Sequence, residues 1–303
     1  MKTLLSIVLL SLGAAFAQQE VTLDFAASVG DQEIACGVMY EDVGAADSTV
    51  EFQDMRFYVS DIRLISAEGE EVPLELALNP WQHQNVALLD FEDGTARCAE
   101  SGNEAMNSAV TGSVPTGDYT GVIFTLGVPF ALNHADVATA PSPLNISSMW
   151  WSWQGGYKHA RIDLMSHSAA GMAMNEQRDD ASEGGDQEGE HGGAAQAGLW
   201  PIHIGSTGCD SSASVIPPAT PCANPNVAEV RLEDIDLEND TIIADVSALL
   251  EDVDVSQSLE MAPPGCMSGG EDPDCSALFA NLSLSPGATQ TFFRTSSQVA
   301  RAE

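Results

Sequence analysis

The distribution of apolar and polar positions along the chain predicts strands rather than helices. Runs rich in β-branched and aromatic residues, separated by turn-forming residues, occupy residues 52–64, 86–91, 119–126, 158–164 and 199–204. Within residues 158–164, apolar and polar positions alternate as they do in a half-buried strand. Helical periodicity is scarce, and residues 135–138 and 246–250 permit only short turns. The pattern predicts an all-β fold, an antiparallel β-sandwich with long loops and few short helices.

The apolar run at the N-terminus predicts export. Lys2 precedes an apolar stretch at residues 4–12, and Ala15 and Ala17 place small residues at the two positions that a signal peptidase reads. We expect a signal peptide over residues 1–17, cleaved after Ala17, and a single β domain over residues 18–303. The run is shorter than the ~20 residues of a membrane-spanning helix, and no later stretch approaches that length. We therefore expect a periplasmic or secreted protein without membrane insertion.

Residues 175–198 differ in composition from the rest of the chain. They are mainly Asp, Glu, Gly, Gln and Ala, with almost no large apolar side chain. Such a segment buries too little apolar surface to offset the entropy lost on ordering. We expect a mobile acidic insert here, in which His191 is a solvated side chain rather than a ligand.

The chain as a whole is strongly acidic. Its 45 Asp and Glu residues against 10 Lys and Arg give a formal net charge of -35. This surface repels phosphate backbones and anionic lipids, so nucleic acid and membrane surfaces are not expected partners. The simplest interpretation of the charge is solubility, and a more specific one is attraction of cations or of a basic protein.

Six cysteines in an exported chain predict structural disulfides. We expect three pairs, which are Cys209 with Cys222, Cys266 with Cys275 and, by exclusion, Cys36 with Cys98. Spacing alone does not fix connectivity among six cysteines, so this pairing is a hypothesis. No Cys-Xaa-Xaa-Cys or Cys-His spacing indicates zinc.

The densest candidate chemistry lies in the segment from Met149 to Trp153, which holds three tryptophans in four residues. If the segment is extended, Met149, Trp151 and Trp153 point to one face and Trp150 and Ser152 to the other. A core strand filled by aromatic side chains would explain much of this pattern. The number of indoles and the Gly-Gly that follows exceed simple filling, and they suggest redox chemistry as well.

Histidines supply the second candidate chemistry. His134 ends a strand-like run, and His203 lies inside another strand shortly before Cys209, whereas His83 and His159 have no comparable setting. A neutral imidazole is a good copper ligand, and a thioether favours the cuprous state. Taken singly, each histidine is more often a hydrogen-bonded structural residue than a ligand. Spacing does not show whether His134 and His203 meet.

Other functional motifs are weaker or absent. Asp234, Asp236 and Asp240 alternate along one stretch, but they lack the glycine and terminal glutamate of a calcium-binding loop. The chain has no nucleophile elbow, glycine-rich phosphate loop or haem-attachment motif. The motifs therefore give no basis for hydrolytic or phosphoryl-transfer catalysis.

Several longer motifs in a fixed order resemble the MbnP family, the four-cysteine-motif members of a metal-associated gene pair. These motifs are residues 55–64, 86–91, 127–134, 140–145, 151–158 and 203–209, and the resemblance extends from about Val21 to Leu284. It implies a periplasmic protein encoded beside an MbnH-like di-haem enzyme of the MauG-like peroxidase class. The enzyme oxidises the first tryptophan of a WxW motif to kynurenine, and the modified protein binds one cuprous ion. Trp151 is that tryptophan here, because Trp151 and Trp153 bracket a single serine.

His134 and His203 fall inside these motifs, and we expect them to bind copper(I) together with the oxidised Trp151. Met149 is a further candidate ligand. The expected function is copper binding in copper acquisition or homeostasis, with the chain a substrate of the di-haem enzyme and not itself an enzyme. Two alternatives stay open, a copper-dependent oxidase or peroxidase-type enzyme and a secreted, calcium-stabilised interaction module.

Overall fold

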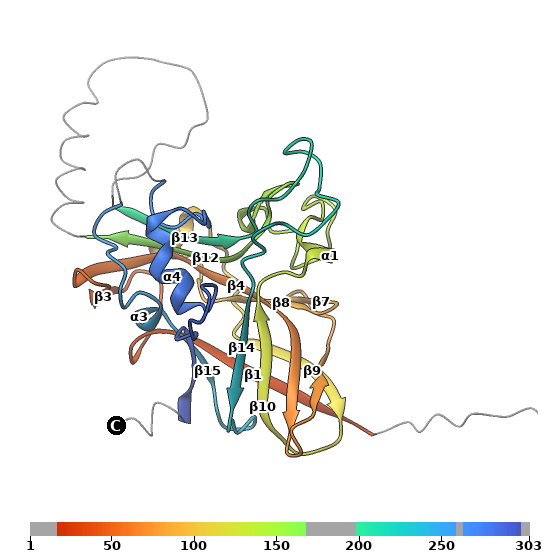
Figure 1. The fold of residues 1–303 in the computed structure, drawn as a ribbon. Coiled ribbons are helices and arrows are strands. Elements are labelled where there is room, and N and C mark those ends of the chain that lie inside the picture. The colour runs from red at the N-terminus through yellow and green to blue at the C-terminus, as the bar shows by residue number, and fades with distance from the viewer. Residues whose placement is uncertain (1–16, 168–197, 259–262, 298–303) are drawn as a thin grey trace, which may run out of the picture.

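The computed structural model describes residues 17–167, 198–258 and 263–297 (Figure 1). Apart from Ala17 and Gly198, the predicted signal peptide and the predicted acidic insert lie outside the described residues. The strands predicted from the apolar pattern are all present, and most extend by one or a few residues beyond the predicted bounds.

Strands make up most of the regular structure. They are β1 (Gln18–Val29), β2 (Gln32–Glu33), β3 (Met39–Val43), β4 (Ser48–Ser66), β5 (Glu71–Pro73), β6 (Glu75–Leu76), β7 (Gln82–His83), β8 (Val86–Asp90), β9 (Ala109–Pro115), β10 (Tyr119–Leu126), β11 (Trp150–Ser152), β12 (Gly156–Ser166), β13 (Leu199–Gly205), β14 (Ala228–Glu233), β15 (Ile242–Asp245) and β16 (Phe293–Thr295). Within the described residues the helices are all short, and they are α1 (Phe130–Asn133), α3 (Val246–Leu249), α4 (Ser276–Asn281), η1 (Ala96–Glu100), η2 (Ser147–Met149) and η3 (Pro273–Cys275). Both stretches predicted to turn do so, at α3 and where Asp136 accepts backbone hydrogen bonds from Thr139 and Ala140.

The strands form two sheets. The first has the order β16-β15-β1-β9-β6, with β2 beside the end of β1. The second has the order β11-β12-β4-β10-β14, with β13 beside β12, with β3, β5 and β8 beside β4, and with β7 beside β8. The pairings are antiparallel except that β1 runs parallel to β15. The predicted antiparallel β-sandwich is therefore confirmed, with this one parallel pair as the difference.

The 19-residue strand β4 joins the two ends of the second sheet. Its residues 50–57 pair with β12, whereas its residues 59–66 pair with β10. In Figure 1, β12 and β13 cross the upper half of the view, and β10 descends to the lower end.

Aromatic side chains fill the space between the sheets. Phe25 of β1 packs edge-on against Phe124 of β10, with ring centroids 5.8 Å apart. Phe293 of β16 lies 5.0 Å from Phe124 and 5.5 Å from Phe57 of β4. Because these rings come from both sheets, their burial holds the two layers of the sandwich together.

The second sheet is also covered on its outer face. Tyr58, Met149 and Tyr157 form part of a separate buried apolar cluster there, and the hydroxyl of Tyr58 donates to the carbonyl of Pro143 at 3.0 Å. β12 is consequently buried along nearly its whole length, so the prediction of a half-buried strand at residues 158–164 was wrong. The alternation in the sequence separates two buried environments, one apolar and one of paired charges.

Three disulfides have the predicted connectivity, Cys36–Cys98, Cys209–Cys222 and Cys266–Cys275. No helix among the described residues is long and apolar enough to cross a membrane. Disulfides of this kind are typical of proteins that fold in an oxidising compartment.

Candidate metal centre

The side chain of Trp151 lies against the backbone of β13. Trp151 is the middle residue of β11, which pairs with the start of β12 through Trp150 and Tyr157. A methyl group placed on Gly205 would stand 2.5 Å from Cζ3 of the Trp151 indole and 2.9 Å from the carbonyl oxygen of Tyr157. Glycine at this position is therefore what lets the ring approach β13 so closely.

One side of the Trp151 indole faces a cavity of about 490 Å³. The residues that line it with Trp151 are Ser152, Gln154, Gly155, Ser206, Thr207, Gly208, Cys209 and Met267. Met267 is thus the methionine that shares this cavity with the candidate tryptophan. The cavity is therefore lined by residues with hydroxyl groups, a methionine and an indole, which are residue types with polar and soft donor atoms.

The other two tryptophans pack against each other rather than against Trp151. The rings of Trp150 and Trp153 meet edge-on, with centroids 6.1 Å apart. Met149 is fully buried in the outer apolar cluster and does not line the cavity. The single extended face predicted for Met149, Trp151 and Trp153 is therefore wrong, because a 3-10 turn ends at Met149 and β11 ends at Ser152.

His134 has contacts at both of its ring nitrogens, and Asn133 Nδ2 lies 3.4 Å from Nε2. His134 directly follows α1, its Nδ1 donates to the carbonyl of Trp153 at 3.1 Å, and its Nε2 lies 3.7 Å from Sγ of Cys222. Cys222 is disulfide-bonded to Cys209, which lines the Trp151 cavity. Burial lowers the pKa of His134, with the hydrogen bond to Trp153 acting in the opposite direction. The ring is thus neutral near pH 7, with the Nε2 lone pair directed to the disulfide.

His203 lies two residues before Gly205 on β13, at a position that points to the same face of the strand. Its Nε2 contacts Oδ1 of Asp163 at 2.8 Å, and Nδ1 is not used in that pair. Burial lowers the pKa of His203, although the hydrogen bond to Asp163 opposes this change. Burial would also raise the pKa of Asp163, but the hydrogen bonds and charges of His203 and Arg161 outweigh it and lower that pKa to about 2.

A line of buried ion pairs fixes Asp163 in turn. Arg161 contacts Asp163 at 2.7 Å and Asp54 at 3.1 Å, and Asp54 also pairs with Arg56. Each charge in this line has an opposite partner, which is the condition under which burial of charge is tolerated. The ring of His203 is therefore anchored through β12 to the central strand β4.

The remaining described histidines fit a ligand role less well. His159 is fully buried and both of its ring nitrogens are occupied, since Nδ1 accepts from the backbone of Val128 and Nε2 contacts the carbonyl of Pro225. Burial lowers the pKa of His159 to about 4. His83 and His167 contact Gln84 and Glu51. His191 lies outside the described residues.

Histidines that bind a metal through one ring nitrogen commonly have the other ring nitrogen held by a carbonyl or a carboxylate. His134 has the first arrangement and His203 the second. Trp151 contacts Gly205, which lies two residues after His203 on β13. His134 contacts Cys222, whose disulfide partner Cys209 lines the Trp151 cavity. Met149 lies apart from them in the outer apolar cluster. Sequence reasoning missed Asp163, Gly205 and Met267. The Gly205-Ser206-Thr207-Gly208 run was the available signal for close backbone approach, whereas nothing in the sequence pointed to Met267.

Two other groups of potential ligands are already committed. His134 with Cys209 and Cys222, and Glu92 with Cys36 and Cys98, place their ligand atoms within 4.8 Å of one another, but all four cysteines are in disulfides. Two of the carboxylates considered for calcium likewise accept hydrogen bonds from the backbone. Asp236 accepts from the backbone of Glu238, and Asp240 accepts from the backbone of Ser297.

The fold and the site define a disulfide-bonded, all-β protein in which Trp151 lines a cavity and two imidazoles each have one ring nitrogen held by an oxygen. A family model described as MbnP matches residues 18–268, and the chain belongs to the MbnP family. The solved structure of MbnP from Methylosinus trichosporium is similar over 92% of this chain and 98% of that chain, with a TM-score of 0.72 and 29% sequence identity. A comparison with curated protein sequences finds no match. The family match ends before Cys275 and α4.

Proposed function

We propose that this protein binds one cuprous ion at the Trp151 end of the sandwich and serves copper acquisition or homeostasis in the periplasm. A MauG-like di-haem enzyme, the counterpart of MbnH, would first oxidise Trp151 to kynurenine. The observation that carries the proposal is the orientation of His134 and His203, each with one ring nitrogen held by an oxygen. Nδ1 of His203 takes no part in its pair with Asp163, whereas Nε2 of His134 faces Sγ of Cys222 and the side-chain amide of Asn133, so this ring would have to turn to bind the metal.

Oxidation would change what the Trp151 side chain can bind. Oxidative cleavage of the C2–C3 bond by the peroxide-using di-haem enzyme, followed by hydrolytic loss of C2 as formate, would leave an aromatic amine with a neighbouring ketone. An apolar side chain would thus gain nitrogen and oxygen donors. Trp151 borders a cavity with room for this product, whereas Trp150 does not line it. This difference supports Trp151 as the modified residue.

The donor set suits a soft, singly charged metal. Both imidazoles are kept neutral by burial, so no proton has to be removed before they bind. Met267, in place of Met149, is the methionine that lines the cavity beside Trp151. Imidazole and thioether ligands together favour copper(I) over harder cations such as calcium.

The test compares three forms of the full chain, each co-expressed with the di-haem enzyme. In the natural chain and in Trp150→Phe, the peptide that contains residue 151 should have the mass of kynurenine, and the protein should retain one copper. Trp151→Phe should show neither property while keeping its thermal unfolding temperature. Stoichiometric copper in Trp151→Phe would contradict the proposal, as would kynurenine at position 150.

A copper enzyme is the competing function, since the cavity beside Trp151 could admit a small molecule to the metal. Turnover of an added reductant with oxygen or peroxide by the copper form would favour the enzyme. Absence of turnover with full copper retention would favour the carrier that we propose.

A further inference from the structure

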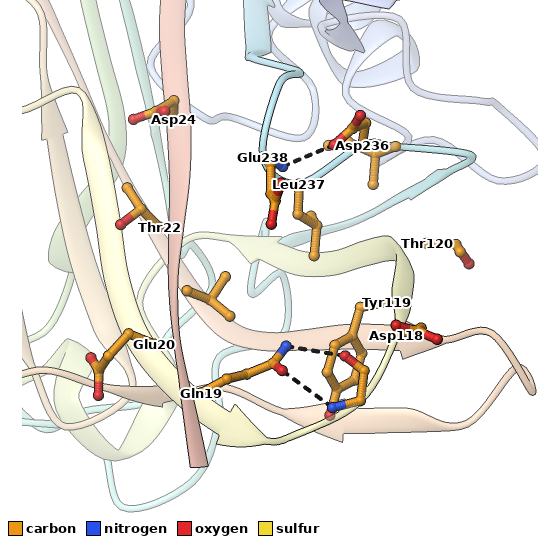
Figure 2. Close-up of a pocket in the computed structure, with 13 residues that line it drawn as sticks. Gln19, Glu20, Thr22, Asp24, Asp118, Tyr119, Thr120, Asp236, Leu237 and Glu238 are labelled. Atoms are coloured by element: carbon orange, nitrogen blue, oxygen red, sulfur yellow. Dashed lines mark hydrogen bonds between the residues drawn. The ribbon is translucent and has the colours of Figure 1, made fainter.

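A groove of about 620 Å³ runs beside the first half of β1 (Figure 2). Three segments line it, namely residues 19–24 of β1 without Leu23, the turn at residues 117–120, and residues 235–238 that follow β14. In Figure 1, the β9–β10 turn lies at the lower end of the molecule, whereas β12 and β13 lie in the upper half. The groove is thus separate from the Trp151 site.

The groove exposes an unpaired strand edge. On one edge, β1 pairs with β9 from Gln18 to Asp24. On the other edge, β15 pairs with β1 only from Phe25 to Ser28. Within the part of the chain that the structure describes, no strand pairs with residues 18–24 on this second edge. Such an edge presents backbone N–H and C=O groups that an incoming strand can use.

The chain before β15 turns away from this edge. Because β15 runs parallel to β1, continuing it toward its N-terminus would have placed residues 236–241 along the open edge. Instead, the carbonyl of Asp236 accepts from the backbone of Asn239 at 3.1 Å and of Asp240 at 2.7 Å. The carboxylate of Asp240 accepts from the hydroxyl and the backbone of Ser297 at 2.9 and 3.1 Å. This fixed turn forms a wall of the groove and leaves the edge open.

The lining determines which strand would fit. Its charged residues are all acidic, namely Glu20, Asp24, Asp118, Asp236 and Glu238. Between them, Val21, Tyr119 and Leu237 pack against the main core and supply an apolar floor. An added strand shares the two faces of its neighbour, so alternate side chains would lie beside Val21 and beside the carboxylates.

We propose that this groove is a docking site for an extended basic segment of another protein, which adds as a strand to residues 19–24 of β1. Its apolar side chains lie beside Val21, and its lysines or arginines lie beside Glu20 and Asp24. Main-chain hydrogen bonds give affinity in this mode, and the alternate side chains give specificity. A second copy of this chain is disfavoured, because two molecules with a net charge of -35 repel each other.

The probe is a labelled peptide of about seven residues that alternates Lys and Val, the length of a typical strand. Its binding to the full chain is followed by fluorescence anisotropy at roughly 0.15 M salt. We expect saturable binding and slower amide hydrogen exchange within residues 19–24. A peptide with Gln in place of Lys, and one with N-methyl groups on alternate amides, should each bind at least about tenfold more weakly.

Variants separate docking from general attraction to an acidic surface. The double variant Asp118→Lys with Glu238→Lys should weaken binding about tenfold, whereas the control Glu41→Lys with Glu104→Lys, outside the groove, should change it less than about twofold. Equal binding of the N-methylated peptide would overturn the proposal, as would equal effects of the two double variants. The proposal would also be overturned if exchange of the same amides slowed without peptide, either on self-association of the protein or on addition of calcium alone. Either result would assign this edge to another occupant.

Discussion

Gly205→Ala tests directly how the Trp151 ring is held. The added methyl group would stand 2.5 Å from Cζ3 and 2.9 Å from Cη2 of the indole, and 2.9 Å from the backbone oxygen of Tyr157. That oxygen belongs to β12, which is bonded to β4 and β13, so the ring makes the larger shift and the β12–β13 backbone gives by a few tenths of an ångström. Restoring an ordinary carbon–carbon contact of about 3.5 Å requires a displacement of about 1 Å.

The cost to folding should be modest. Overpacking of this size destabilises a protein by about 1–3 kcal/mol, and replacing glycine by alanine offsets about 0.4–1 kcal/mol of this through the unfolded chain. We expect a net loss of about 1–2 kcal/mol, which lowers the unfolding temperature by a few degrees and leaves the protein folded.

The effect on copper should be larger than the effect on folding. If the oxidised Trp151 supplies a ligand, a shift of about 1 Å separates it from the two imidazoles. A loss of about 1.4 kcal/mol of binding free energy corresponds to a tenfold larger dissociation constant, and we expect the dissociation constant for copper(I) to rise at least tenfold. The assay is competition for copper(I) with a chromophoric chelator, on protein matured with the di-haem enzyme, together with the mass of the peptide containing Trp151.

Gly270→Ala is the matched control, because a methyl group there would meet no heavy atom within 4 Å. If Gly205→Ala binds copper(I) as tightly as Gly270→Ala, with equal conversion of Trp151, the ring is not held by β13 in the way described. If Gly205→Ala fails to fold, the double variant Gly205→Ala with Trp151→Phe should recover part of the stability, because the smaller ring removes the clashes with Cζ3 and Cη2.

Further predictions concern charge and covalent links. Because the folded-state pKa of Asp163 is lowered to about 2, its ion pairs stabilise the protein above about pH 4, and this contribution of about 2 kcal/mol disappears as the pH falls toward 2. Asp163→Asn should therefore be less stable at pH 7, by urea unfolding, and should approach the natural chain near pH 2. Burial raises the pKa of Asp90 to about 7, although Arg56 opposes this. The natural chain should therefore lose stability as the pH rises from about 4 to about 7. Asp90→Asn should unfold at a higher temperature than the natural chain at pH 8, and at nearly the same temperature at pH 4. Serine at both Cys209 and Cys222, 13 residues apart, should cost about 3 kcal/mol and weaken copper(I) binding, whereas serine at Cys266 and Cys275 should lower stability while changing copper(I) binding less.

The strands were predictable because their apolar pattern is local. Residues 119–126 coincide with β10, and the run predicted at residues 199–204 became β13 with one added residue. The disulfide pairs followed from proximity in the sequence and exclusion. Solvent exposure was not predictable in the same way, because the segment from Val128 to Trp150 folds back over this face and packs against Tyr58 and Leu88, which lie far away in the sequence.

The candidate site was predictable by residue type and not by geometry. The motifs identified Trp151, His134 and His203, but the oxygen that orients each imidazole lies on another element. Met149 was favoured because it neighbours Trp151 in the sequence, and one 3-10 turn places it in the apolar cluster instead. Met267 reaches the cavity through a disulfide-bonded loop, a long-range contact that spacing does not encode.

The strand β4 has a consequence for how this protein unfolds. Since one continuous strand is bonded to β12 in its first half and to β10 in its second, neither end of the molecule can open alone without breaking part of the same ladder. Amides in the middle of β4 should then exchange only when the whole domain unfolds. Their exchange rate therefore reports the rate of global unfolding. Slower exchange caused by copper at one end, or by a docked strand at the other, can be compared with this rate in a single sample.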